Sequence, residues 1–142
     1  MLGGGPIGLE MAQSFARLGS TVTVVEMGQR IMPREDADVS ACVTQRLRGE
    51  GINILTEHKA VEFVHGDTNK LVCETTNGNV EVEFDKVLIA VGRKANVKGF
   101  GLEKLNVEMR KNGTVEANDF LQTNYPNIYA CGDVTGPYQL TH

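Results

Sequence analysis

Three glycines near the start of the chain, Gly3, Gly5 and Gly8, have the G-x-G-x-x-G spacing that can hold a diphosphate. The first glycine permits a tight turn, the second lets the backbone approach a pyrophosphate, and the third lets a helix pack closely on a strand. Free N–H groups and the positive dipole end at the start of that helix attract the phosphates. The pattern therefore predicts a dinucleotide site, with contacts from Gly3, Gly5, Pro6, Ile7 and Gly8.

Glu26 stands about eighteen residues after Gly8, at the end of a predicted strand. Its carboxylate can accept hydrogen bonds from a ribose diol and repels a 2′-phosphate, which predicts NAD in preference to NADP. Arg30 offers the alternative of a 2′-phosphate ligand, although it stands well beyond the strand end. A plain loop at the glycines and a solvated acid at Glu26 are further alternatives, and the agreement of helix, strand and acid in one register favours the dinucleotide.

Hydrophobic periodicity indicates the elements that must position these residues. Apolar residues at helical spacing predict an amphipathic helix that ends at Gly19, and they are Ile7, Met11, Phe15 and Leu18. A β-branched run predicts a buried strand over residues 21–25, and a second helix is expected over 38–48 with Val39, Cys42, Val43 and Leu47 on one face. Residues 52–55 are expected to form a short strand.

Alternating residues after the second helix predict strands over 60–65, 71–76 and 80–84. Because Asn77-Gly78 is a strong hairpin signal, this stretch should be an antiparallel meander rather than a third helix. The apolar run over 87–91 predicts another buried strand, 94–105 a loop, Lys111-Asn112-Gly113 a turn, and 127–133 a strand that runs into a Gly-Asp corner. The fold class predicted is α/β, a Rossmann-like dinucleotide-binding domain with an antiparallel three-stranded meander as one crossover.

Composition narrows the possible functions. With 142 residues, 41% hydrophobic and 23% charged, the chain has the size and balance of one soluble globular domain. A net charge of −4, no basic stripe and no long apolar run speak against nucleic-acid and membrane partners. Cys42, Cys73 and Cys131 are widely spaced, with no His nearby, so they are expected to be reduced core thiols of a cytoplasmic protein rather than metal ligands.

Four motifs in order resemble the pyridine nucleotide-disulfide oxidoreductase family, which includes dihydrolipoamide dehydrogenase, glutathione reductase and mercuric reductase. They are residues 3–10, 24–26, 87–93 and 128–134, so the resemblance covers essentially the whole chain. Residues 33–36 and 136–138 look most like the mercuric-reductase-like branch. Four motifs at the right spacing are far more specific than one.

The resemblance implies a role for each matching residue. Gly92 matches the glycine that lies against the nicotinamide dinucleotide, Glu10 the glutamate that pairs with a lysine of the flavin domain, and Gly132-Asp133 the motif whose aspartate binds the ribitol of FAD. Pro6 replaces a tyrosine or valine near the nicotinamide pocket, so an aromatic gate is absent.

Without the family resemblance, each of these residues has a simpler structural interpretation. Gly92 is then a turn glycine, Glu10 an acid in the first turn of a helix, Asp133 a helix cap and Arg93 a surface charge. His142 matches a position near the flavin helix.

By the same resemblance, residues 1–115 form the NAD(P)-binding domain and 116–142 an incomplete segment that returns to the FAD-binding domain. The longer protein, expected to be a homodimer, adds an FAD-binding half with a cysteine pair before the chain and a dimerisation domain after it. It would pass hydride from NAD(P)H through FAD to a disulfide or related acceptor. The chain alone should bind NADH and catalyse nothing, with no catalytic residue and no metal of its own.

Two other classes of protein remain as alternatives. A small dinucleotide-binding module could sense redox state without catalysis. A self-contained dehydrogenase would need a tyrosine-lysine or histidine-aspartate group beside the nicotinamide, and Tyr125, Tyr129 and Tyr138 have no lysine four residues on.

Overall fold

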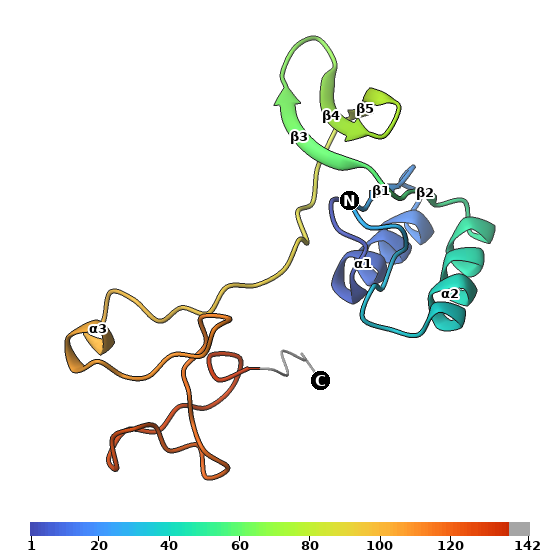
Figure 1. Ribbon diagram of the computed structural model, residues 1–142. Coiled ribbons are helices and arrows are strands. Elements are labelled where there is room, and N and C mark those ends of the chain that lie inside the picture. The colour runs from blue at the N-terminus through green and yellow to red at the C-terminus, as the bar shows by residue number, and fades with distance from the viewer. Residues whose placement is uncertain (137–142) are drawn as a thin grey trace. The chain divides into compact units, whose positions relative to one another are not determined.

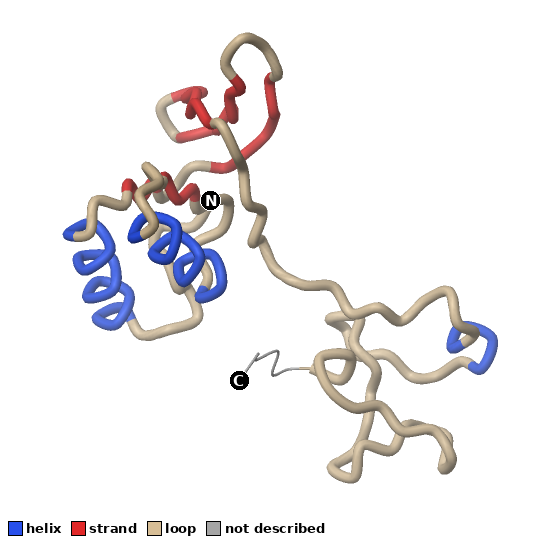
Figure 2. The backbone as a smooth tube through the Cα atoms, turned by 180° about the vertical axis from the view of Figure 1, so that it is seen from behind, coloured by secondary structure: helices blue, strands red, loops and turns tan. Residues whose placement is uncertain are grey.

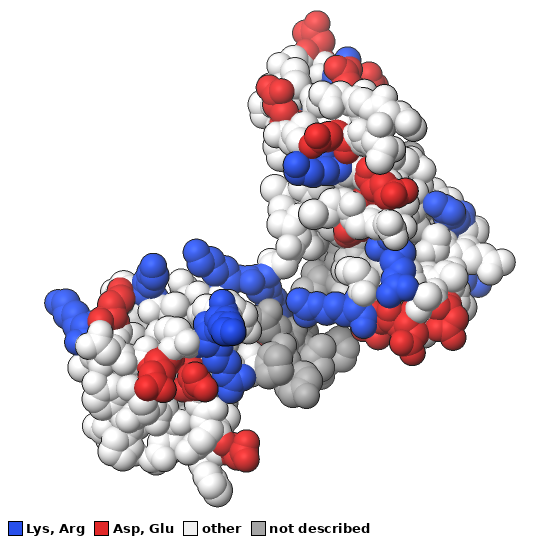
Figure 3. All heavy atoms as spheres, in the orientation of Figure 1, with Lys and Arg blue, Asp and Glu red and all other residues white. Residues whose placement is uncertain are grey.

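The computed structural model describes residues 1–136, and the chain divides into two compact units, Met1–Gly92 and Arg93–His142. Both units carry acidic and basic side chains on the face drawn in Figure 3. The predicted boundary at residue 115 concerns which cofactor each part contacts, and it stays a prediction beside the observed division at Gly92. Two residues named from the sequence, Tyr138 and His142, lie outside the described residues.

A parallel sheet forms the centre of the first unit (Figure 1). Strand β1 (Thr23–Val25) pairs in parallel with β2 (Asn53–Leu55). On the other side of β1, Leu2 forms parallel bridges to Val25 and to Ile89. The order is therefore β2, β1, the Leu2 segment and the Ile89 segment, which is the 3-2-1-4 order of a Rossmann half and confirms the predicted fold class.

Two helices cover one face of this sheet. Helix α1 (Pro6–Arg17) connects the glycine turn to β1, and α2 (Ala37–Gly49) leads to β2, close to the bounds predicted from the sequence. Side chains from helices and sheet share one core, made of Leu9, Ala12, Val22, Val24, Ile31, Leu47, Ile52 and Ile54. Burial of this apolar surface fixes the start of α1 against the sheet.

The opposite face is covered by the predicted meander (Figure 2). Strands β3 (Lys59–Val64), β4 (Asn69–Thr75) and β5 (Gly78–Phe84) form an antiparallel sheet in that order. A second core joins the two sheets, made of Val25, Leu71 and Cys73 with the partly buried Leu2, Leu55, Ala60, Val82 and Phe84. Because strand residues alternate in direction, Val24 faces the helices and Val25 faces the meander.

The helix α1 was predicted from a stripe of apolar residues at helical spacing, but this stripe is not the face that α1 buries. Phe15 is 43% and Leu18 81% exposed, whereas α1 buries Gly8, Leu9 and Ala12. The helix approaches the sheet closely at Gly8 and Ala12, with Leu9 in the core, so Phe15 and Leu18 lie to one side of the contact. The position of the helix was predicted correctly and its orientation was not.

Two predicted strands are wrong in extent. Over 87–91 only Ile89 forms a bridge, because Leu2 is the one residue of the neighbouring segment that pairs with it. Ile89 and Val91 are 58% and 68% exposed, so this run is also not buried as predicted. Over 127–133 only Tyr129 forms a bridge, to Gln122. A short helix, α3 (Leu102–Leu105), stands in the predicted 94–105 loop.

The cysteine prediction holds for one residue of three. Cys73 is buried between the sheets, and its burial raises the pKa of the thiol. Cys42 and Cys131 are exposed, because helical spacing placed Cys42 on the outward face of α2. Among residues 1–136, no group of three His, Cys, Asp or Glu side chains could hold a metal ion. The same part of the chain contains no helix long and apolar enough to cross a membrane.

Glu50, directly after α2, ties the two helices together. Its carboxylate accepts hydrogen bonds from Arg17, Gln13 and Arg46 at 2.9–3.0 Å. The hydrogen bond from Arg17 is the main reason that the pKa of Glu50 falls from 4.5 to about 2. A carboxyl group with a lowered pKa stabilises the folded state above its ordinary pKa, and this stabilisation is lost as the pH falls towards 2.

We expect Glu50→Gln to lower the melting temperature at pH 7 and to lower it much less near pH 2, where about half of the wild-type carboxyl groups are protonated. Thermal unfolding of both proteins across this range measures the difference. Glu62→Gln, on the exposed surface of β3, is the control and should change little at either pH. An equal deficit for Glu50→Gln at both pH values would contradict this interpretation.

Candidate dinucleotide site

The first and third glycines of the turn are required by close contacts. Gly3 has a φ of +105°, and a Cβ added to it would lie 2.5 Å from the carbonyl oxygen of Ala90. A Cβ added to Gly8 would lie 2.3 Å from the carbonyl oxygen of Gly3. Real Cβ atoms do not approach oxygen so closely, so side chains at both positions would separate the helix, the turn and the sheet.

Gly5 has the opposite environment. It is the N-cap of α1, in an extended conformation with φ −80° and ψ 172°, and no atom lies within 4 Å of a Cβ added to it. No side chain caps the helix, and its first turn contains no acid. The first N–H groups of a helix have no acceptor within the helix, and Pro6 has no N–H group at all. The amides of Ile7 and Gly8 are therefore placed to bind an anion.

Glu10 is the fifth residue of α1 and lies beyond its first turn. An acid at this distance gains little from the helix dipole, so the simple reading of Glu10 as a dipole-paired residue is wrong. The side chain is exposed, and its role towards a flavin stays a prediction.

The carboxylate of Glu26 joins the end of β1 to the glycine turn. Its two oxygens accept the backbone N–H groups of Gly4 and Gly28, each at 2.7 Å. A carboxylate has about four lone-pair sites, so these two bonds leave acceptor capacity for a ribose diol. Arg30, the alternative ligand for a 2′-phosphate, donates instead to the carbonyl oxygen of Glu35 at 3.0 Å.

Gly92 is the last residue of the first unit and has a φ of +123°, a backbone conformation that residues with a side chain rarely adopt. It follows Ala90, whose Cβ would lie 3.4 Å from a Cβ on Gly8. The carboxyl ends of the parallel segments thus bring the glycine turn, Glu26 and the 90–92 segment to one edge of the sheet. Ligands of open α/β sheets bind at such an edge.

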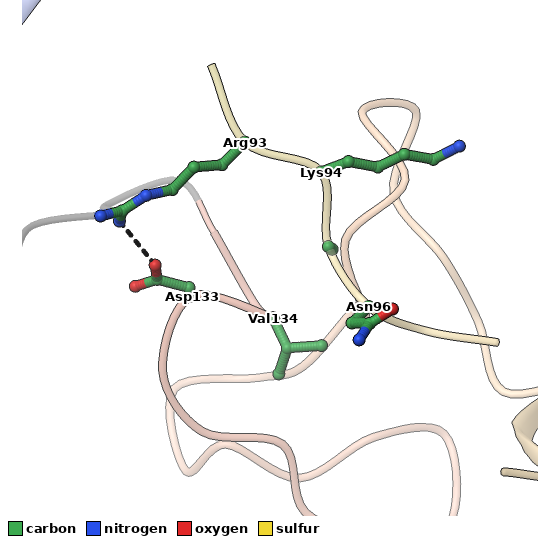
Figure 4. A pocket seen from close by; sticks show the side chains of 6 residues that line it. Arg93, Lys94, Asn96, Asp133 and Val134 are labelled. Atoms are coloured by element: carbon green, nitrogen blue, oxygen red, sulfur yellow. Dashed lines mark hydrogen bonds and ion pairs between the residues drawn. The ribbon is translucent and has the colours of Figure 1, made fainter. Parts of the chain in front are cut away.

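The predicted flavin motif belongs to the second unit. Gly132 has a φ of +85°, and Asp133 accepts a hydrogen bond from Arg93 Nη1 at 2.7 Å (Figure 4). Arg93, Lys94, Ala95, Asn96, Asp133 and Val134 line a cavity of about 410 Å³. Asp133 and Arg93 therefore form an ion pair, and the roles of Gly132 and Asp133 towards FAD stay a prediction. Nothing in the separation of Arg93 and Asp133 along the sequence indicated this pair.

A second cavity, of about 560 Å³, lies in the first unit. Arg30, the alternative ligand of a 2′-phosphate, lines it, but the residues predicted to bind NAD or FAD do not. Its lining is Gln29, Arg30, Ala37, Ser40, Ala41, Thr44, Gln45, Arg48 and Thr56.

All residues from 1 to 142 match the family described as pyridine nucleotide-disulphide oxidoreductase. The chain belongs to this family. It is 40% identical over 143 residues to dihydrolipoyl dehydrogenase from Mycobacterium leprae, and 37% identical over 142 residues to that of Bacillus subtilis. Each match covers 100% of the chain and 31% of the relative, so the chain spans about a third of the length of these family members.

Solved structures agree with this assignment. The Cu(II) complex of the HOCl-induced flavoprotein disulfide reductase RclA from Escherichia coli matches with a TM-score of 0.87 and 33% identity, over 99% of the chain and 32% of RclA. An engineered water-forming NADPH oxidase bound to NADPH matches with a TM-score of 0.81 and 27% identity, over 94% of the chain and 29% of the oxidase.

We expect Gly8→Ala to destabilise the fold by about 1–3 kcal/mol, because the added methyl group meets the backbone at Gly3. Gly49→Ala, at the end of α2 with no atom within 4 Å of the new Cβ, is the matched control and should be neutral or slightly stabilising. Urea unfolding of the three proteins measures the difference. Equal stability of the two variants would show that the close approach at Gly8 has been misjudged.

Proposed function

We propose that the chain is the NAD(H)-binding part of an FAD-dependent pyridine nucleotide-disulfide oxidoreductase. The observation that carries the proposal is the uncapped start of α1 at Gly5, beside the carboxylate of Glu26. In this proposal the amides of Ile7 and Gly8 bind the pyrophosphate and Glu26 binds the adenosine ribose. The nicotinamide end then extends along Gly92, with Pro6 beside it.

We propose NAD rather than NADP as the preferred nucleotide. In this proposal the carboxylate of Glu26 accepts hydrogen bonds from the adenosine ribose, and its charge would repel a 2′-phosphate. The guanidinium group of Arg30 donates to the backbone carbonyl oxygens of Pro33 and Glu35, which gives it other partners than a phosphate. One structural relative is bound to NADPH, but it is an engineered protein, so the preference here is argued from this chain's own residues.

Gly132 and Asp133 are the residues that we propose to contact FAD in the intact protein. Their surroundings fit a polyhydroxyl chain, because the carboxylate of Asp133, the amide of Asn96 and the guanidinium of Arg93 line one cavity. FAD, when bound, would supply the acceptor for the hydride of NADH and pass electrons on to a disulfide or related acceptor. Glu10, exposed on α1, would pair with a lysine of the flavin-binding part.

This division of roles defines the rest of the proposal. Residues 1–115 would bind NAD(H), and residues 116–142 would belong to the FAD-binding domain. The intact protein would be a cytoplasmic homodimer with domains outside this chain. The chain alone would bind NADH without turnover, because the residues described here position a nucleotide and supply no hydride acceptor.

We expect the wild-type chain to bind NADH with a micromolar or weaker Kd, and Gly5→Ala to weaken binding about tenfold or more. The added methyl group would occupy the space where the pyrophosphate approaches the backbone. Because that space is open in the structure and the backbone is extended, the melting temperature should stay within about 3 °C. Calorimetric titration and thermal unfolding give the two values. Unchanged NADH affinity in Gly5→Ala would remove the glycine turn from the site.

The second expectation concerns the choice of nucleotide. Glu26→Gln keeps the size of the side chain but removes the charge, so the ratio of NADPH affinity to NADH affinity should rise roughly tenfold. Using this ratio cancels any loosening of the turn, because both nucleotides share the same pyrophosphate. Glu57→Gln, an exposed change just after β2, should leave the ratio unaltered. A wild-type preference for NADPH would overturn the role of Glu26.

A further inference from the structure

A segment between Glu26 and α2 holds the glycine turn from behind. We call residues 28–35 the strap. Near its start, Gly28 N donates to Glu26 Oε1 at 2.7 Å, and further along Met32 N donates to the carbonyl oxygen of Gly4 at 2.8 Å. Gly4 N in turn donates to Glu26 Oε2 at 2.7 Å. The strap is therefore bonded both to the proposed ribose acceptor and to the proposed phosphate turn.

The strap packs tightly on the turn through Ile31. This side chain is fully buried, and its Cγ2 atom would lie only 2.9 Å from a Cβ added to Gly4. The carbonyl oxygen of Ile31 accepts a hydrogen bond of 2.7 Å from Ser40 Oγ on α2, and Ser40 is itself 2% exposed. Without that hydroxyl, a buried carbonyl would lose its side-chain partner.

Met32 shows that the strap is held in an unfavourable conformation. Its φ is +49°, in the left-handed region that residues other than glycine rarely adopt. Its N–H is bonded to Gly4, and its carbonyl oxygen accepts the N–H of Glu35 at 3.0 Å. Such a conformation persists only where the surroundings determine it, and the contacts of Ile31 with Ser40 and Gly4 supply that constraint.

We propose that Ser40 is a positioning residue for the dinucleotide site. Through the carbonyl of Ile31 it fixes the strap, and the strap fixes the amide of Gly4 and the carboxylate of Glu26. This inference rests on the proposed function, since it concerns the affinity of the same site. Ser40→Ala would loosen the pyrophosphate turn that NADH and NADPH share and would leave the negative charge of Glu26 in place. Its loss should therefore weaken both nucleotides by similar factors, unlike the removal of the charge at Glu26.

The test compares Ser40→Ala with Thr44→Val in the full chain. Thr44 is one turn further along α2, and its hydroxyl donates to the carbonyl oxygen of Ser40 and not to the strap, so its removal is a matched control. We expect Ser40→Ala to weaken NADH and NADPH roughly tenfold each, with their ratio unchanged. Thr44→Val should bind both as the wild type does. In the free chain, the amide NMR resonances of Gly4 and Gly28 should shift in Ser40→Ala only.

Wild-type affinity in a folded Ser40→Ala protein would overturn the proposal. If Ser40→Ala does not fold, variants of Met32 provide the test, since glycine adopts the φ observed at Met32 freely and valine does not. Met32→Val should then weaken both nucleotides while Met32→Gly retains them, and equal affinities in the two variants would overturn the proposal. Failure of the wild type to bind either nucleotide would overturn the proposed function, and a shift of the Gly4 resonance in Ser40→Ala would still report the mechanical link.

Discussion

The carboxylate of Glu26 accepts one N–H group from Gly4 and one from Gly28, and the proposed site is organised around these two bonds. Gly4 belongs to the turn before α1 and Gly28 to the strap after β1, so one side chain joins two loops that leave the sheet at the same edge. The bonds involve a charged acceptor and are 2.7 Å long, which makes them stronger than ordinary backbone hydrogen bonds. Their geometry places a negative charge next to uncapped amides at the start of α1.

Packing on both faces of the sheet explains why short strands are enough to hold the glycine turn in place. β1 and β2 have three residues each, and Leu2 and Ile89 add single bridges. Helices on one face and the meander on the other supply two cores, so the edge that carries the glycine turn is fixed by packing rather than by long strands. The sterically required glycines, Gly3 and Gly8, serve the packing, whereas Gly5 faces open space and is available to a ligand.

Much of the first unit could be predicted from the sequence because its signals are local. The glycine turn, the acid at the end of β1 and the hairpin at Asn77-Gly78 each act within a few residues, and each is found where it was expected. Periodicity did not give the buried face of α1, since a helix that approaches a sheet through Gly8 and Ala12 leaves Phe15 at the surface. Cys42 was misjudged in the same way, because an apolar character does not show which helix face is covered.

The remaining contacts depend on residues far apart in the chain. The pairing of Arg93 with Asp133 spans two motifs that were recognised separately, and no spacing rule links them. Ser40 resembles any serine near a helix start until the structure places its hydroxyl on the carbonyl of Ile31. The left-handed conformation of Met32 has no signal in the sequence, because it is imposed by the contacts of the strap.

The most direct test of the account is a crystal structure of the chain soaked with NADH. We predict density for the pyrophosphate against the amides of Ile7 and Gly8, and hydrogen bonds from the adenosine ribose to the carboxylate of Glu26. A nucleotide bound elsewhere, or an empty edge at saturating NADH, would contradict it.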